Sequence, residues 1–415
     1  MLGSSEIEIY KKSIEEIFAS YEDEGGFISY YMAEELRNDL YYCIDEIIVR
    51  LMMRYEKYDE AFTMTSLIMK KMNEADIDDS DGITLDILYC CKEIIQDIEK
   101  NSNDILRHRI FEWTEGIMER KQSYDILHDI VEEIWLGSFH ENIYLARKKE
   151  LILNELKKAE SESDEDYRRY KIGKWLEKYF LVALESSTPE KEIKDMEKRY
   201  WYTTEARKHA VMREMLSGDL KSAENHLKES RLLDKDYPGL VIKYTRKLIE
   251  IYEKTGDKEN IIKELTLQVT KYDKCNVDSF RKLKSYYDET QWEMVRKNIF
   301  KSLEKDFRVA DLYAEEEMYD MLLEHIEKYQ RFDTFERYVK KLWDVYPKKV
   351  LSIYEKEVRE KAEYASGRKY YRNIVGLLRN MQFCDEGIET VNRIVDEFRE
   401  TYKRRTAMMD ELDRL

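Results

Sequence analysis

Glycine and proline are scarce in this chain of 415 residues, which contains 13 glycines and 3 prolines. Sheet proteins need many tight turns, and those turns depend on glycine and proline. Charged residues instead make up 38% of the chain, well above the usual quarter. We therefore expect an all-α protein in which long helices are joined by short connections.

Histidine is scarce too, with six residues, and no two of them stand at the spacing of a helical zinc or di-iron site. The signature motifs of common hydrolases, nucleoside triphosphatases and dinucleotide-binding domains are absent from the sequence. We expect no catalytic residues, no metal and no cofactor. A metal-dependent hydrolase built on aspartates stays open as an alternative.

Cysteine is odd in number and scattered, which argues against a disulfide framework. The five cysteines are Cys43, Cys90, Cys91, Cys275 and Cys384. Their pattern is typical of buried, reduced thiols in a cytoplasmic protein. The N-terminal residues lack the basic and apolar regions of a signal peptide, and no apolar run reaches membrane-spanning length. We expect a cytoplasmic protein without membrane contact.

Apolar residues recur at helical spacing through most of the chain. In "YPGLVIKYTRKLIEIYEKTG" five apolar residues are spaced three or four positions apart. These are Val241, Tyr244, Leu248, Ile251 and Tyr252. Gly256 follows as the expected C-terminal cap of this helix.

Helical hairpins are predicted at a loose spacing in the second half. "GDLKSAENHL" begins at Gly218, and the similar "GDKENIIKEL" begins at Gly256. Ala223 and Ile261 lie five positions after these glycines, where the second helix of a pair approaches the first. The pattern of Gly218, Ala223 and Pro238 resembles a tetratricopeptide repeat (TPR). We predict an irregular α-solenoid of antiparallel helical hairpins, TPR- or HEAT-like, with an acidic region 1–186 and a second region 187–415.

The stretch "NEADIDDSDGITLD", residues 73–86, is the nearest approach to a chemical motif. It contains Asp76, Asp78, Asp79 and Asp81. If Gly82 is placed at position six of a calcium loop, Ile77 and Leu88 occupy the first and last ligand positions, so the loop fails. A side chain within residues 79–81 is expected to cap the following helix. A docking point for a basic group and a weak cation site stay open.

Charge is distributed unevenly, and two basic–aromatic stretches lie near the C-terminus. Residues 1–100 contain 24 acidic and 10 basic residues, whereas residues 331–415 contain 16 acidic and 19 basic ones. The two stretches contribute Arg368, Lys369, Tyr370, Tyr371 and Arg372, and then Lys403, Arg404 and Arg405. Such residues can bind phosphates and stack on bases, bind a protein partner, or form a solvated helix face.

Several islands resemble the helical region downstream of the finger in bacterial SWIM zinc-finger proteins. They are "GGFISYYMAEEL", "DIDDSDGITLDIL", "GRKYYRNIVGLLRNM" and "YKRRTAMMDEL". The resemblance implies a helical-repeat region that is usually attached to a module thought to bind nucleic acid or protein. The finger's ligand pattern, Cys-x-Cys followed by Cys-x-His, is absent here, so zinc is not carried over.

These observations together predict a non-enzymatic scaffold, adaptor or regulatory subunit that binds a protein partner. An accessory factor that contacts nucleic acid through the C-terminal basic–aromatic residues, or through a partner, is the alternative. The net charge of −17 favours the first, because an acidic chain repels phosphates.

Overall fold

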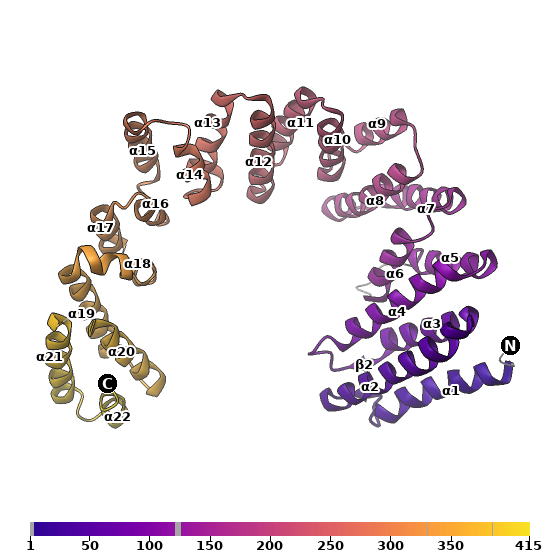
Figure 1. The fold of residues 1–415 in the computed structure, drawn as a ribbon, viewed down its shortest axis with the longest axis horizontal. Helices are drawn as coiled ribbons and strands as arrows, with labels where there is room; N and C mark the ends of the chain where they lie inside the picture. The colour runs from indigo at the N-terminus through magenta and orange to yellow at the C-terminus, as the bar shows by residue number, and fades with distance from the viewer. Residues whose placement is uncertain (1–3, 121–125, 330, 384) are drawn as a thin grey trace. The chain divides into compact units, whose positions relative to one another are not determined.

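The computed structural model describes residues 4–120, 126–329, 331–383 and 385–415. Within them 22 α-helices account for nearly all regular structure, beside three π- or 3-10-helical segments and two strands of two residues each (Figure 1). The expected all-α class is confirmed. None of the described helices combines the length and the apolar character that crossing a membrane requires.

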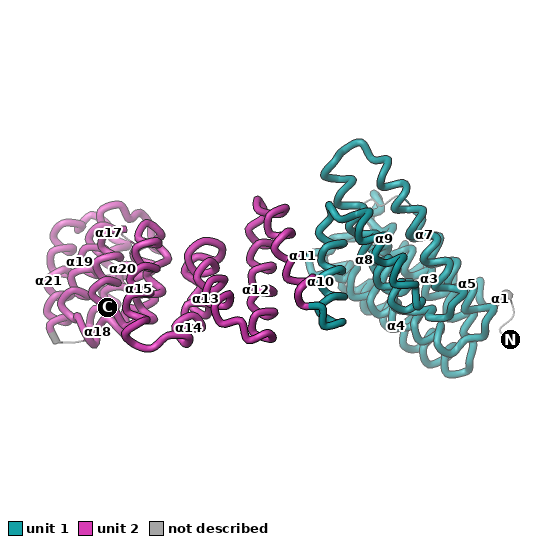
Figure 2. Tube along the Cα trace, turned by 90° about the horizontal axis from the view of Figure 1, so that it is seen from above, with its two compact units in different colours: residues 1–219 teal, residues 220–415 magenta. Residues whose placement is uncertain are grey.

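The helices group into two compact units, residues 1–219 and 220–415 (Figure 2). The predicted boundary at 186/187 falls between two helices of the first unit. That unit contains α1 (Ser4–Tyr21), α2 (Tyr30–Tyr42), η1 (Cys43–Met52), η2 (Met53–Tyr55), α3 (Tyr58–Glu74), α4 (Ile83–Asn101), α5 (Asp104–Met118), α6 (Ile126–Gly137), α7 (Asn142–Glu160), α8 (Glu165–Glu185), α9 (Glu190–Arg199) and α10 (Thr204–Ser217).

The first unit is built mainly by helices that pack against their neighbours in sequence. The closest pairs are α3 with α4, α5 with α6, and α7 with α8. Contacts of α1 with α3 and of α2 with α4 connect the N-terminal helices further. Two short strands add a parallel bridge, since β1 (Phe27–Ile28) pairs with β2 (Asp76–Ile77). The bridge ties the loop before α2 to the loop before α4.

The second unit consists of twelve further α-helices and one π-helical segment. They are α11 (Leu220–Leu233), α12 (Pro238–Thr255), α13 (Lys258–Leu267), η3 (Gln268–Tyr272), α14 (Val277–Lys284), α15 (Glu289–Leu303), α16 (Val309–Glu315), α17 (Tyr319–Tyr329), α18 (Phe332–Val345), α19 (Pro347–Tyr364), α20 (Arg368–Met381), α21 (Asp385–Thr401) and α22 (Thr406–Leu412). Most of these helices also pack against sequence neighbours, as α12 does against α11 and α13.

Helix α12 confirms the sequence-based prediction in detail. All five of its predicted core residues are buried, and the helix ends at Gly256 with a positive φ of 70°. Glycine adopts this left-handed conformation without the steric cost that a Cβ brings. Ala223 and Ile261 are buried as well. Helix α13 packs against the preceding α12, as the predicted hairpin requires, whereas the strongest contacts of α11 are with α12, which follows it.

Buried glutamates connect neighbouring helices of the second unit. Glu264, Glu316 and Glu411 have side chains at most 4% exposed, and each pairs with at least one lysine or arginine. A carboxylate taken out of water is tolerated only when charge and hydrogen bonds replace its hydration. These pairs therefore fix which helices lie side by side.

Of the cysteines that the structure describes, Cys43, Cys91 and Cys275 are buried as expected, whereas Cys90 is half-buried. Cys43, Cys90, Cys91 and Cys275 are free thiols, and Cys384 lies outside the described residues. Burial raises the pKa of the Cys43 thiol to about 11, which keeps it protonated near neutral pH.

Candidate functional site

The aspartate stretch serves first as the start of α4. The carboxylate of Asp79 accepts a hydrogen bond from the backbone N–H of Thr84 at 2.8 Å. This bond satisfies one of the amides that a helix leaves free in its first turn. Gly82, the residue before the helix, has a φ of 74°. Asp79 thus accepts from one amide of the first turn, as expected of a side chain within residues 79–81.

The other aspartates have local partners or face water. Asp81 accepts from the Tyr30 hydroxyl at 2.7 Å, a bond that raises the pKa of Tyr30, and Asp78 accepts from Ser80. Asp76 belongs to strand β2. No lysine or arginine of the described residues forms an ion pair with any of the four, and no metal-binding group of three or more side chains occurs in the same part of the chain.

Replacing Asp79 by alanine should destabilise the first unit by about 1 kcal/mol, because a helix cap of this kind contributes that much. For a unit of this size the loss corresponds to a melting temperature roughly 2–4 °C lower in a thermal unfolding experiment on the full chain. Asp76→Ala is the matched control, since it removes an exposed carboxylate that caps nothing. Equal melting temperatures for the two variants would refute the capping role.

Two of the predicted C-terminal basic residues surround a buried acid. Arg368 pairs with Asp410 at 2.7 Å, and both Arg368 and Arg372 lie 3.5 Å from a Glu411 oxygen. The Glu411 side chain is 4% exposed. These contacts join the start of α20 to α22.

Arg405 is engaged by the end of α19. Its guanidinium donates to the carbonyl oxygen of Ala362 at 2.6 Å and to that of Glu363 at 3.3 Å, and it stacks over the Tyr402 ring at 4.3 Å. The last carbonyls of a helix lack partners within the helix and carry partial negative charge, which favours a cation there. Arg405 therefore acts as a cap for α19.

The remaining predicted residues are divided between the interior and the surface. Tyr371 is buried, whereas Tyr370 is 62% exposed. Lys369, Lys403 and Arg404 are exposed. Tyr370 also lines a pocket of about 630 Å³ whose other residues include Glu357, Glu360 and Glu363. The space beside this aromatic ring is consequently acidic.

The second unit contains a basic groove that the sequence did not single out. It has a volume of about 760 Å³, and five of its eleven lining residues are lysine or arginine. We call it the basic groove. Its residues are Lys228, Arg231, Leu232, Lys235, Pro238, Val241, Asn260, Lys263, Glu264, Lys271 and Tyr272.

Arg231 and Glu264 form the interior of the basic groove and connect α11 to α13. The guanidinium makes two hydrogen bonds to the carboxylate, one of them at 3.1 Å, and lies 5.5 Å from the centre of the Tyr272 ring. Burial alone would lower the pKa of Arg231, but the bonds to Glu264 outweigh it and the pKa is raised. This pair is a fixed structural element.

Lys228 is held at one end of the groove by Glu224. Its ammonium lies 2.6 Å from a carboxylate oxygen that also accepts from the Tyr252 hydroxyl at 2.9 Å. Burial would raise the pKa of Glu224, but hydrogen bonds from Lys228, Lys221 and Tyr252 lower it to about 2. Glu224 is therefore ionised at neutral pH, and Lys228 is partly neutralised.

Three lysines of the groove have no acidic partner among the described residues. They are Lys235, Lys263 and Lys271, and all three are exposed. Beside them lies Leu232, whose side chain is 73% exposed. The only acidic residue that lines the groove is Glu264, which Arg231 already neutralises. The arrangement thus offers unpaired positive charge next to an apolar side chain.

The sequence does contain a signal for this groove. Lys228, Arg231 and Lys235 are separated by three and four positions, and Lys263 and Lys271 by eight, which is the spacing of one face of a regular helix. In the structure Lys235 follows the end of α11 and Lys271 lies in η3. Basic residues are frequent throughout the chain, however, with 71 lysines and arginines. Spacing alone could not distinguish this set from the others.

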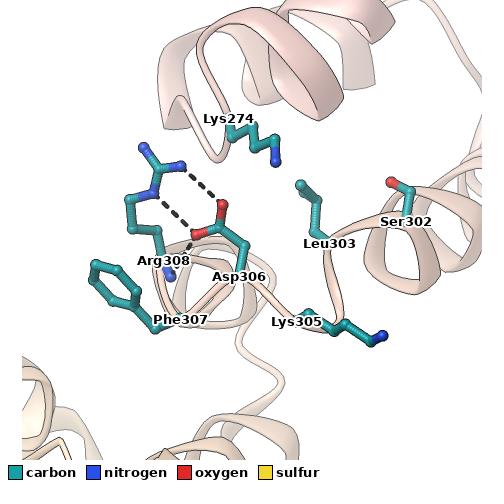
Figure 3. Close-up of a pocket in the computed structure, with 7 residues that line it drawn as sticks. All are labelled: Lys274, Ser302, Leu303, Lys305, Asp306, Phe307 and Arg308. Atoms are coloured by element: carbon teal, nitrogen blue, oxygen red, sulfur yellow. Dashed lines mark hydrogen bonds and ion pairs between the residues drawn. The ribbon is translucent and has the colours of Figure 1, made fainter.

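A neighbouring pocket of about 490 Å³ lies next to the start of α16 and is less suited to an anion (Figure 3). Its arginine, Arg308, is already paired with Asp306, with nitrogen–oxygen distances of 2.9 and 2.8 Å. Lys305 points away from this pair (Figure 3). Of the basic residues that line this pocket, Lys274 is left to face the Arg308–Asp306 pair.

No protein-family model, no curated protein and no solved structure matches this chain. The resemblances to SWIM zinc-finger proteins and to tetratricopeptide repeats therefore stay predictions.

Proposed function

We propose that the chain is a cytosolic, non-enzymatic scaffold or adaptor subunit that binds a protein partner along an irregular solenoid of helical hairpins. The observation that carries the proposal is the packing pattern inside each unit. Helices mainly contact their neighbours in sequence, such as α3 with α4, α7 with α8, and α11 with α12. Arrays of this kind expose an extended surface, and proteins use such surfaces to bind partners.

Exposed apolar side chains support the same proposal. Tyr31, Ile105, Leu184, Leu216 and Tyr364 are each at least 78% exposed. Single exposed apolar residues are ordinary on soluble proteins, but aromatic side chains are also preferred anchors of protein interfaces. They would contribute contact area on either unit.

The test uses the full chain as bait in lysate from its native source, followed by size-exclusion chromatography with light scattering. A protein that co-elutes at a fixed ratio, with or without nuclease treatment, is the expected result. Cross-linking mass spectrometry then locates the contact on the helices. If the chain elutes alone, the scaffold proposal fails. If co-elution disappears with nuclease, the partner is held through nucleic acid and the accessory-factor alternative replaces it.

A further inference from the structure

The basic groove differs in charge from the chain that carries it. The whole chain has a net charge of −17, yet the groove presents five basic residues against one acid. After the pairs of Arg231 with Glu264 and Lys228 with Glu224 are formed, Lys235, Lys263 and Lys271 still lack an acidic partner in the described structure. An anionic ligand would give these three lysines a partner of opposite charge.

The groove also has an apolar side. Leu232, which lines it, is 73% exposed. Pro238 contributes a further apolar lining residue. Removing such surface from water favours a ligand that carries a large aliphatic or aromatic side chain.

We infer that the basic groove binds an acidic segment of a partner protein, and that this segment carries at least one large apolar side chain next to its carboxylates. The inference rests on the proposed scaffold function and names the chemistry of the partner. The three unpaired lysines would pair with carboxylates, and the apolar side chain would contact Leu232.

A protein segment fits the groove better than a nucleic acid does. Binding to a single strand relies on aromatic rings that are free to stack on bases. The aromatic ring in the lining, Tyr272, already has Arg231 at 5.5 Å and Lys271 at 5.3 Å from its centre. Aliphatic Leu232 provides no stacking surface but suits an apolar side chain. The volume of about 760 Å³ also accommodates a few side chains.

The experiment measures fluorescence anisotropy of a labelled synthetic peptide with the full chain. The peptide has about 12 residues, ~40 Å when extended, and consists of Glu and Asp around one central Leu. Comparison probes replace the acids by Gln and Asn, replace Leu by Ser, or use a single-stranded oligonucleotide of equal charge. We expect the acidic peptide with Leu to bind most tightly, and to bind about tenfold more weakly when salt rises from about 50 to about 300 mM.

Charge reversal locates the site. The triple variant Lys235→Glu, Lys263→Glu, Lys271→Glu should weaken peptide binding by about tenfold or more. The control is Lys297→Glu, Lys301→Glu, Lys340→Glu, which changes the net charge equally at exposed lysines outside the groove. It should stay within about twofold of the wild type. Circular dichroism verifies the fold of both, and a Lys→Gln triple at the groove positions replaces the reversal if that variant does not fold.

Three results would overturn the inference. They are equal binding of the acidic and amidated peptides, equal loss in the two triple variants, and preference for the oligonucleotide. The scaffold proposal is tested separately, with the partner captured in the pull-down. If the groove triple still co-elutes with that partner at the same ratio while peptide binding is absent, the groove inference fails and the scaffold proposal stands. If no partner is captured at all, the scaffold proposal fails.

Discussion

Replacing Glu316 by alanine is expected to lower the free energy of unfolding of the second unit by about 3–5 kcal/mol, the usual loss when a buried ion pair is broken from one side. The Glu316 side chain is 2% exposed and accepts from Lys284 at 2.8 Å, Arg296 at 2.6 Å and the Trp292 indole at 3.0 Å. The variant leaves all three donors without their acceptor. A thermal unfolding curve of the full chain should show a transition lowered by about 10 °C.

Glu293→Ala is the matched control, since Glu293 lies on the same helix as Trp292 but is exposed. Its melting temperature should change by about 1 °C or less.

The pH dependence of the difference between wild type and Glu316→Ala is a second test of the role of Glu316. Burial would raise the pKa of Glu316, yet hydrogen bonds from Lys284, Arg296 and Trp292 lower it below the ordinary 4.5. Its stabilisation is therefore complete above that pH and is lost as the pH falls further, so wild type and Glu316→Ala should converge in acid. A constant difference down to acid pH would contradict the assigned role.

Replacing Gly387 by alanine is expected to separate α21 from α20, at a cost of about 3 kcal/mol. A Cβ built on Gly387 would lie 1.8 Å from the carbonyl oxygen of Met381 and 3.4 Å from a Leu351 methyl group. The first of these atoms belongs to the backbone, so it cannot move aside as the end of a flexible side chain can. Hydrogen exchange should show faster exchange of the amides of α21, while the helices of the first unit keep their protection.

Gly376→Ala is a control for which we expect a change in stability of the opposite sign. Gly376 lies inside α20, and outside its own helical turn no atom of the described residues comes within 4 Å of a Cβ at this position. Alanine is the better helix former by about 1 kcal/mol, so this variant should be slightly more stable than the wild type. If both glycine variants were equally stable, the close contact at Gly387 would not determine how α21 packs.

The helices could be predicted from the sequence because their signals are local. The spacing of Val241, Tyr244 and Leu248 defines one face of α12, and Gly256 ends the helix by its own conformational freedom. The cap at the start of α4 was predictable for the same reason, since Asp79 lies five residues from the amide that it binds. How the helical pairs continue along the chain depends on contacts between helices and stays a prediction.

The roles of the C-terminal basic residues could not be predicted, because their partners are distant in sequence. Arg405 binds carbonyls near residue 362, and Arg368 binds Asp410. About 40 residues separate each pair, so residue type and spacing carry no trace of the contact. The basic groove was missed for a related reason: whether a lysine such as Lys263 is paired or free depends on which acids the fold brings near it.

The parallel bridge between β1 and β2 limits how the N-terminal end of the chain can vary. In a repeat array, hairpins can be gained or lost during evolution because each one contacts only its neighbours. Here Phe27 and Asp76 are partners across 49 positions of sequence, and α3 lies between the bridged segments along the chain. Deleting or duplicating α3 would break this pairing together with the contacts of α1 with α3. We therefore expect the segment from Phe27 to Ile77 to be retained or exchanged as a whole, not one helical pair at a time.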